Sequence, residues 1–235
     1  MQRLSAAEKI RMWDDAWRPD KYGASTSYGP SLIRTEDVKD KRVLEIGCGD
    51  LFFSYHLDHV GEYIGVDISP NALLRARENF PKGTFVQADA SVSLPFTDRS
   101  FDTVLAIETI TCSGPDAKGI LKEAGRVLYS NGELIFDVFH KDLVTTHSKY
   151  KPNVELIGEL DYGTLLRNRI TNNDVITFDE EGIAKLLGSV GLRVENMHVM
   201  TDYERSNMGV PIYERTDKPP EGDIKSLMFV VATPE

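Results

Sequence analysis

Short apolar runs alternate with helical segments between residues 42 and 138, and this alternation constrains the fold of the chain more than any other feature. The runs are apolar on both sides, as strands are when both faces of a sheet are covered. Five of them end at a turn or at a helix start: Val43–Ile46, Tyr63–Asp67, Thr84–Ala88, Phe101–Ile107 and Leu134–Val138. The stretch 116–128 between two of these runs has apolar residues at helical spacing. The pattern predicts an α/β fold with a doubly wound, mostly parallel sheet and helices on both faces.

The segments on either side of this alternation predict how the domain is completed. Ser5 and Glu8 form a capping-box pattern before a first helix, and Thr177 and Glu180 form another before a late helix. Asn131-Gly132 predicts a turn. Two closing strands are predicted at 192–199 and 227–232. A length of 235 residues fits one domain, so we expect a single domain over 1–235. Within it we expect an N-terminal helical lid over 1–40, a substrate-side insertion over 141–176 and a long loop over 201–226.

Charge and composition exclude several classes of partner. The chain holds 27 Lys and Arg against 37 Asp and Glu, a formal net charge of -10. Such a surface repels nucleic-acid phosphates and anionic membranes, so neither partner is expected. Two cysteines do not make a disulfide framework, and no cluster with metal-ligand spacing stands out. The N-terminus lacks the apolar core of a signal peptide and no run is long enough to span a bilayer, so we expect a cytoplasmic protein.

Three features place a ligand at the end of the first strands. Glu45-Ile46-Gly47-Cys48-Gly49 lies where the first strand meets a turn, and glycines there let the backbone approach a ligand. Asp67 ends the second strand, about 20 residues downstream, where an acid can accept hydrogen bonds from ribose hydroxyls. Asp89 follows the third strand and can accept from an adenine amine. Each feature alone fits a tight turn or a helix cap, but their combination predicts a nucleoside site.

Two other nucleotide-binding motifs fit the turn less well. A nicotinamide-dinucleotide fingerprint, Gly-x-Gly-x-x-Gly, would place its last glycine at Phe52, whose side chain blocks close packing of helix and strand. A phosphate-binding P-loop needs Gly-Lys followed by Ser or Thr, and no such triplet follows Gly49.

With these residues in place, the sequence resembles the class I S-adenosylmethionine (SAM)-dependent methyltransferases, in the subgroup with an Asp/Glu-x-Gly-x-Gly motif. The similar stretches are 43–49, 64–69, 85–90 with Leu94-Pro95-Phe96, 100–104, 120–137, 177–194 and 228–234. They cover most of residues 40–140 and 177–235. The resemblance implies a Rossmann-like domain with an antiparallel last strand, SAM as cofactor and S-adenosylhomocysteine as product. One departure is Leu51, where the family often has a third glycine; we interpret 51–53 as core residues of the following helix.

The resemblance also implies roles for individual residues at the cofactor. The turn Gly47-Cys48-Gly49 packs against the methionine and adenosine parts, and Glu45 orders this turn or meets the cofactor through water. Asp67 holds the ribose. The remaining implied contacts are Ile68 on the adenine, Asp89 and Ala90 at the adenine edge, and main-chain groups near Ala106 and Ile107 at the methionine amine. Tyr22 and Tyr28 are candidates to fold over the cofactor as part of the lid, or are ordinary packing residues.

The expected reaction is transfer of a methyl group to O or N of a small-molecule acceptor by in-line displacement. Because the sulfonium is an excellent leaving group, positioning supplies much of the catalysis, and a base is needed only where the acceptor loses a proton. His140 is a candidate base or a solvated loop residue. Glu108 is a candidate for holding a cationic substrate or the cofactor amine, or is a surface acid. Arg167 and Arg169 fit a substrate carboxylate or a solvated edge.

Two other functional classes fit the same motifs. The chain can be a homologue that binds SAM or S-adenosylhomocysteine without turnover and acts as a partner or regulatory module. It can also be a protein or RNA methyltransferase, although the net charge of -10 speaks against RNA. No metal is expected, and the sequence does not identify the acceptor.

Overall fold

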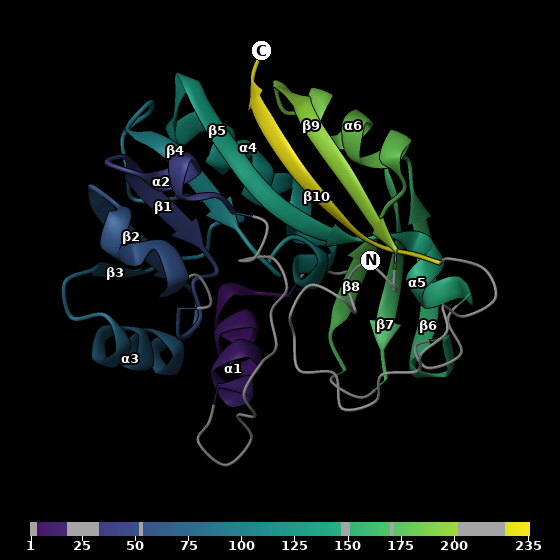
Figure 1. Cartoon of the computed structure of the whole chain (residues 1–235). Helices are drawn as coiled ribbons and strands as arrows, with labels where there is room; N and C mark the ends of the chain where they lie inside the picture. The colour runs from purple at the N-terminus through teal and green to yellow at the C-terminus, as the bar shows by residue number, and fades with distance from the viewer. Residues whose placement is uncertain (1–3, 18–32, 52–53, 147–150, 170–171, 202–223) are drawn as a thin grey trace, which may run out of the picture.

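The computed structural model describes residues 4–17, 33–51, 54–146, 151–169, 172–201 and 224–235. Its centre is a seven-stranded sheet with the strand order β3-β2-β1-β4-β5-β10-β9 (Figure 1). The strands are β1 (Arg42–Ile46), β2 (Glu62–Asp67), β3 (Thr84–Gln87), β4 (Phe101–Ala106), β5 (Leu128–Phe139), β9 (Leu192–Thr201) and β10 (Lys225–Pro234). Neighbours from β3 to β5 are parallel, while β10 is antiparallel to both β5 and β9. The predicted fold class is therefore confirmed, including the antiparallel last strand.

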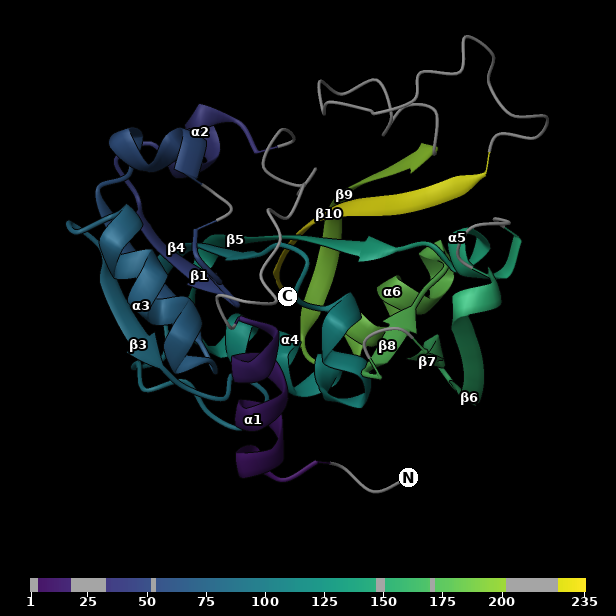
Figure 2. The ribbon, with the colours of Figure 1, turned by 90° about the horizontal axis from the view of Figure 1, so that it is seen from below.

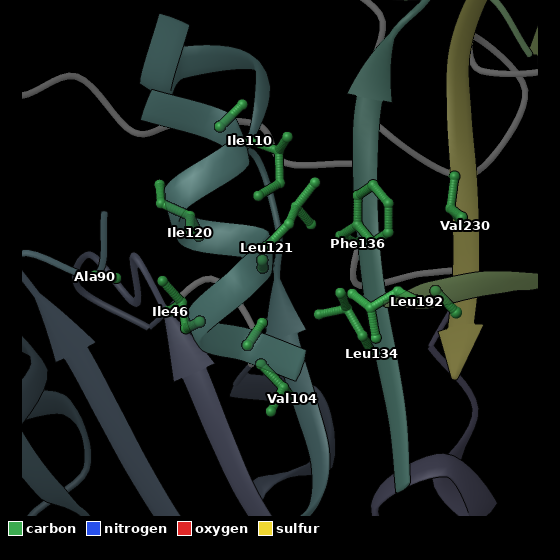
Figure 3. Packing of buried hydrophobic residues seen from close by; sticks show 14 of the residues in the cluster. Ile46, Ala90, Val104, Ile110, Ile120, Leu121, Leu134, Phe136, Leu192 and Val230 are labelled. Atoms are coloured by element: carbon green, nitrogen blue, oxygen red, sulfur yellow. The ribbon is translucent and has the colours of Figure 1, made fainter. Parts of the chain in front are cut away.

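Helices cover both faces of this sheet. Successive strand residues point to opposite faces, so neighbouring residues of one strand join different buried clusters. On one face, Val43 joins a buried cluster with residues of α2 (Thr35–Val38), the 3-10 helix η2 (Ser54–His59) and α3 (Pro70–Asn79). On the other face, Leu44 joins the cluster of α4 (Ala117–Val127) and α6 (Glu180–Gly188). There Leu121 of α4 points toward Phe136 of β5, and both side chains are fully buried (Figure 3). None of the helices in the described residues has the length and apolar character needed to cross a bilayer.

The described residues between 141 and 177 form a second, smaller structure beside the main sheet. It consists of α5 (Lys141–Thr146), the 3-10 turn η4 (Lys151–Asn153) and an antiparallel sheet of β6 (Val154–Leu160), β7 (Gly163–Asn168) and β8 (Asp174–Thr177). Thr177 ends β8, so the predicted cap of the late helix is wrong. Asp179 caps α6 instead: its Oδ1 accepts a hydrogen bond from the Gly182 amide at 2.8 Å.

Two further predictions concern turns and the first helix. The predicted turn Asn131-Gly132 lies inside β5, where the pairing with β4 jumps from Phe101–Leu128 to Thr103–Glu133, so the glycine marks an irregularity rather than the start of a strand. The first helix, α1 (Ala6–Ala16), has the predicted capping box of Ser5 and Glu8. It lies beside the lower ends of the strands in Figure 1, between α3 and the small sheet, and Figure 2 shows it there from below.

Candidate cofactor and substrate site

A cavity of about 1020 Å³ opens where β1, β2 and β4 end. The strand order reverses between β1 and β4, and in open parallel sheets ligands bind at such a point, outside the carboxyl ends of the strands. Three groups of residues form its walls. They are the strand ends and their turns (46–47, 66–68, 88–91 and 107–109), the first helix with residues 4, 8–9, 12–13 and 16–17, and a far wall of residues 112–113, 115–116, 120, 167 and 172–174.

The glycine turn after β1 adopts a backbone that favours glycine. Gly47 has φ +71° and lines the cavity, and Gly49 has φ +53°. A Cβ atom built on Gly47 would lie 2.2 Å from Thr109 Oγ1. Thr109 cannot retreat easily, because this hydroxyl contacts the carbonyl oxygens of Ile46 and Ile107 at 3.0 Å each. The turn is therefore held against the end of β4, with its backbone at the cavity surface.

The position of the third family glycine also has a left-handed backbone. Leu51 has φ +80°, and its side chain is buried among the cluster beneath α3. Such a conformation costs a non-glycine residue roughly 1–2 kcal/mol. Burial of a leucine contributes about 1.5–3 kcal/mol. Leu51 is thus a core residue, as expected, and its burial offsets the backbone strain. It lies in a turn rather than in the predicted helix, and Phe52 and Phe53 lie outside the described residues.

Asp67 is the carboxylate that the structure ties most tightly to the turn. Its Oδ2 accepts from the Gly49 amide at 3.0 Å and its Oδ1 from the Ser69 amide at 2.8 Å. Burial raises the pKa of Asp67, and these hydrogen bonds oppose that effect. A carboxylate has about four lone-pair sites, so both oxygens keep capacity for a ligand. Asp67 and Ile68 both line the cavity.

Asp89 lies on the same cavity wall, after β3. Its Oδ1 accepts from the Ser91 amide at 3.0 Å and the Ser91 hydroxyl at 2.6 Å, and its Oδ2 accepts from Lys9 Nζ at 3.0 Å. Partial burial raises the pKa of Asp89, but these hydrogen bonds outweigh it, and the pKa is lowered overall. Ala90 lines the cavity beside it.

Other residues that the resemblance placed at the cofactor lie behind the cavity wall. Glu45 is buried and accepts a short hydrogen bond from the Tyr63 hydroxyl, and burial raises its pKa to about 8. Cys48 is fully buried, with its sulfur toward Gly65. Ala106 is also fully buried outside the lining, whereas Ile107 lines the cavity. The side chains of Glu45 and Cys48 therefore lie on the core side, away from the cavity.

The two candidate catalytic residues lie in different places. Glu108 lines the cavity with φ +51°, and its amide donates to Asp137 Oδ1 at 2.6 Å. His140 is buried outside the cavity lining. Its Nδ1 accepts from the Asp142 amide at 3.1 Å, which places the neutral-form proton on Nε2, 3.2 Å from Glu180 Oε2. Both nitrogens of His140 are occupied by protein groups.

Of the two candidate arginines, only Arg167 lies at the cavity. Arg167 lines the cavity and donates through Nε to Asp174, which lines it as well. Arg169 lies 3.8 Å from Glu155 and does not line the cavity. Tyr22 and Tyr28 lie outside the described residues. Among the residues that are described, no group of three or more His, Cys, Asp or Glu side chains is arranged to hold a metal ion.

Several lining residues escaped the sequence reasoning. Lys9, Met12 and Trp13 of α1 face the cavity, and Thr109 and Asp116 lie across it. Lys9 and Trp13 are four residues apart, a spacing that puts them on one helix face. That signal was present in the sequence, but the partners of Lys9 lie 80 and more residues away, which no local pattern shows.

This geometry defines a class of protein: a Rossmann-like α/β domain with a cavity at the topological switch point of its sheet. Residues 44–136 match the family model described as "Methyltransferase domain". This match spans about two fifths of the chain, and that region is similar to the class I SAM-dependent methyltransferases, the family that the sequence motifs indicated. SAM, predicted from the sequence, is the cofactor of that family.

The relatives with curated names match part of the chain. A phthiotriol/phenolphthiotriol dimycocerosates methyltransferase 1 of Mycobacterium ulcerans is 37% identical over 105 residues, 43% of this chain and 38% of that protein. A fatty-acid O-methyltransferase of Mycolicibacterium smegmatis is 36% identical over 111 residues, 45% of this chain and 40% of that protein. The matched region thus spans about two fifths of the length of these relatives.

Solved structures share the fold over more of the chain. The 1,6-didemethyltoxoflavin-N1-methyltransferase of Burkholderia thailandensis, solved with bound 1,6-didemethyltoxoflavin and S-adenosylhomocysteine, has a TM-score of 0.65 at 15% identity. The likeness covers 100% of this chain and 92% of that chain. A SAM-dependent methyltransferase of Methanosarcina mazei has a TM-score of 0.62 at 22% identity, covering 83% of this chain and 93% of its own. At these identities the likeness concerns the fold alone.

Proposed function

We propose that this chain binds SAM in the cavity at the strand ends and transfers its methyl group to O or N of a small-molecule acceptor. The observation that carries the proposal is the meeting of Gly47, Asp67 and Asp89 on one cavity wall. Both Asp67 oxygens keep lone pairs for ribose hydroxyls after binding the Gly49 and Ser69 amides. The residues present therefore fit the cofactor.

The rest of the cavity supports a second, small ligand. Ligand pockets typically measure about 300–1,000 Å³, so a cavity of about 1020 Å³ has room for an acceptor beside a nucleoside. Its far wall carries Arg167, Asp174 and Ile120, a mixture of charged and apolar groups. One of the similar proteins is named a fatty-acid O-methyltransferase and another a 1,6-didemethyltoxoflavin-N1-methyltransferase, which supports O or N as the receiving atom.

Methyl transfer from SAM requires little of the protein beyond positioning the two reactants. Bound SAM supplies an electrophilic methyl group on a sulfonium. The chain's own residues orient the nucleoside through Asp67 and enclose the site with α1. Glu108 is the candidate to take up a proton or to hold a positive charge, because it lines the cavity. We leave His140 out of this role, since its ring nitrogens bind the Asp142 amide and Glu180. A cytoplasmic location stays a prediction from the sequence.

The test of the cofactor site is the Asp67→Ala variant. We expect the dissociation constant for SAM to rise at least about tenfold, roughly 1.4 kcal/mol, because the acid proposed to hold the ribose is gone. Isothermal titration calorimetry measures it, and circular dichroism checks that the variant is folded. Glu62→Ala is the matched control, since Glu62 is an exposed acid at the opposite end of the same strand. Unchanged affinity in a folded Asp67→Ala protein would refute the assignment.

Turnover needs its own measurement. Incubation of the wild-type protein with methyl-labelled SAM and a panel of small carboxylates, phenols and amines should give a labelled product and S-adenosylhomocysteine. Binding without any product across the panel would instead favour the non-catalytic SAM-binding class.

A further inference from the structure

Lys9 of α1 connects parts of the cavity wall that are far apart in the sequence. Its Nζ lies 3.0 Å from Asp89 Oδ2, 2.8 Å from Ser91 Oγ and 2.6 Å from Asp116 Oδ2. An ammonium group has three N–H donors, so these partners match its full capacity. The side chains of Lys9, Asp89 and Asp116 are only 12%, 16% and 12% exposed. We call these four residues the Lys9 cluster.

The partners of Lys9 belong to the two sides of the proposed site. Asp89 and Ser91 follow β3, where the adenine edge is expected. Asp116 ends η3 (Thr111–Asp116) and lies on the far wall, before α4. One lysine from the first helix therefore joins the cofactor side of the cavity to its acceptor side.

A second contact anchors the same helix at the start of α3. Asp14 Oδ1 accepts from the Ser69 hydroxyl and the Asn71 amide, both at 2.9 Å. Ser69 in turn donates its amide to Asp67, the proposed ribose acid. α1 is thus attached beside both acids of the nucleoside site, and Met12 and Trp13, between the two anchors, line the cavity.

We propose that Lys9 is a positioning residue that holds α1 closed over the cofactor and fixes the Asp89 carboxylate in place. The proposal rests on the proposed function, since it concerns the affinity of that same cofactor site. Without Lys9, the mostly buried acids Asp89 and Asp116 lose the cation that lies between them, and their repulsion opposes closure of the cavity. Lys9 acts on the ligand through Asp89 and through the helix that carries it.

The experiment is a double-mutant cycle on binding of S-adenosylhomocysteine, measured by calorimetry on the full chain. We expect Lys9→Met to raise the dissociation constant at least about tenfold. Asp116→Asn, which removes one acid outside the proposed nucleoside contacts, should raise it about threefold. The double variant should bind no more weakly than Lys9→Met alone, because the repulsion is relieved when Asp116 is neutral. Lys9→Arg should recover part of the affinity, since it restores the positive charge.

Arg11→Met is the matched control. Arg11 lies on the same helix, and its Nε contacts the Ala7 carbonyl within that helix at 3.2 Å, so the variant makes the same charge change on the exposed face. It should bind S-adenosylhomocysteine like the wild type.

The outcomes separate the two proposals. If the wild type binds no S-adenosylhomocysteine, the proposed function fails, and this inference fails with it. If the wild type binds and Lys9→Met binds within twofold of it, only the role of Lys9 is overturned. Fully additive losses in the double variant would also overturn it. Should Lys9→Met not fold, Asp116→Asn still decides: an unchanged dissociation constant there refutes the shared cluster.

Discussion

At the scale of single residues, two buried carboxylates 22 positions apart have opposite surroundings. Asp67 accepts two backbone N–H groups and faces the cavity. Glu45 lies behind the turn, where its described partner is the Tyr63 hydroxyl. Burial raises the pKa of both, and for Glu45 it raises the pKa to about 8. Glu45 is therefore predominantly protonated at neutral pH, and its side chain lies in the core rather than at the cavity.

The raised pKa of Glu45 predicts a pH dependence of stability. An unfolded glutamate has a pKa near 4.5, so between about pH 4.5 and 8 the folded protein holds a proton that the unfolded chain has lost. The contribution of Glu45 to the free energy of unfolding thus falls as pH rises through this window. Glu45→Gln, which resembles the protonated acid, should lose less stability than the wild type between pH 6 and 9.

Urea unfolding at several pH values measures this difference. The exposed Glu78→Gln on α3 is the control and should follow the wild-type pH profile. Parallel pH profiles for Glu45→Gln and the wild type would contradict the prediction.

At the scale of elements, the turn after β1 depends on its contact with the residues after β4. Gly47 has a left-handed backbone, and Thr109 fills the place where a side chain would go. The turn and the end of β4 thus form one surface at the cavity, held by the Thr109 hydroxyl between the carbonyls of Ile46 and Ile107.

Gly47→Ala tests this contact. The added methyl group would lie 2.2 Å from Thr109 Oγ1, so the Thr109 side chain or the turn has to move. We expect the affinity for S-adenosylhomocysteine to fall at least about tenfold, with a loss of stability of roughly 1–3 kcal/mol from the strained backbone. Gly188→Ala in α6 is the control, because a Cβ there meets no atom within 4 Å, and its affinity should stay unchanged. Wild-type affinity for Gly47→Ala would show that the turn does not form the ligand wall.

At the scale of the whole molecule, the cavity draws its walls from segments across the chain. α1, the strand ends, η3 and the β7–β8 hairpin all contribute, from residue 4 to residue 174. Because unfolding separates all of these segments, a ligand in the cavity should stabilise the entire fold rather than one element.

A thermal shift with S-adenosylhomocysteine measures this linkage. At a free concentration 100 times its dissociation constant, the ligand should add about 2.7 kcal/mol to the free energy of unfolding. For a domain of this size that corresponds to roughly 5–11 °C in melting temperature. Adenine at the same concentration, which lacks the ribose that Asp67 is proposed to hold, should shift it much less. Equal shifts for the two ligands would contradict the role of the ribose.

The sequence by itself determined the parallel sheet, the glycine turn and the acids at the ends of β2 and β3, because strand patterns and turn residues act over a few positions and are legible along the chain. It also placed His140 correctly after β5. Only the tertiary structure shows that the His140 ring lies beside Glu180 and outside the cavity lining. The Lys9 cluster could not be predicted from the sequence either, since its ion pairs join residues 80 and 107 positions apart. Local preference fixes elements, whereas the partners of a charged side chain depend on how distant elements pack.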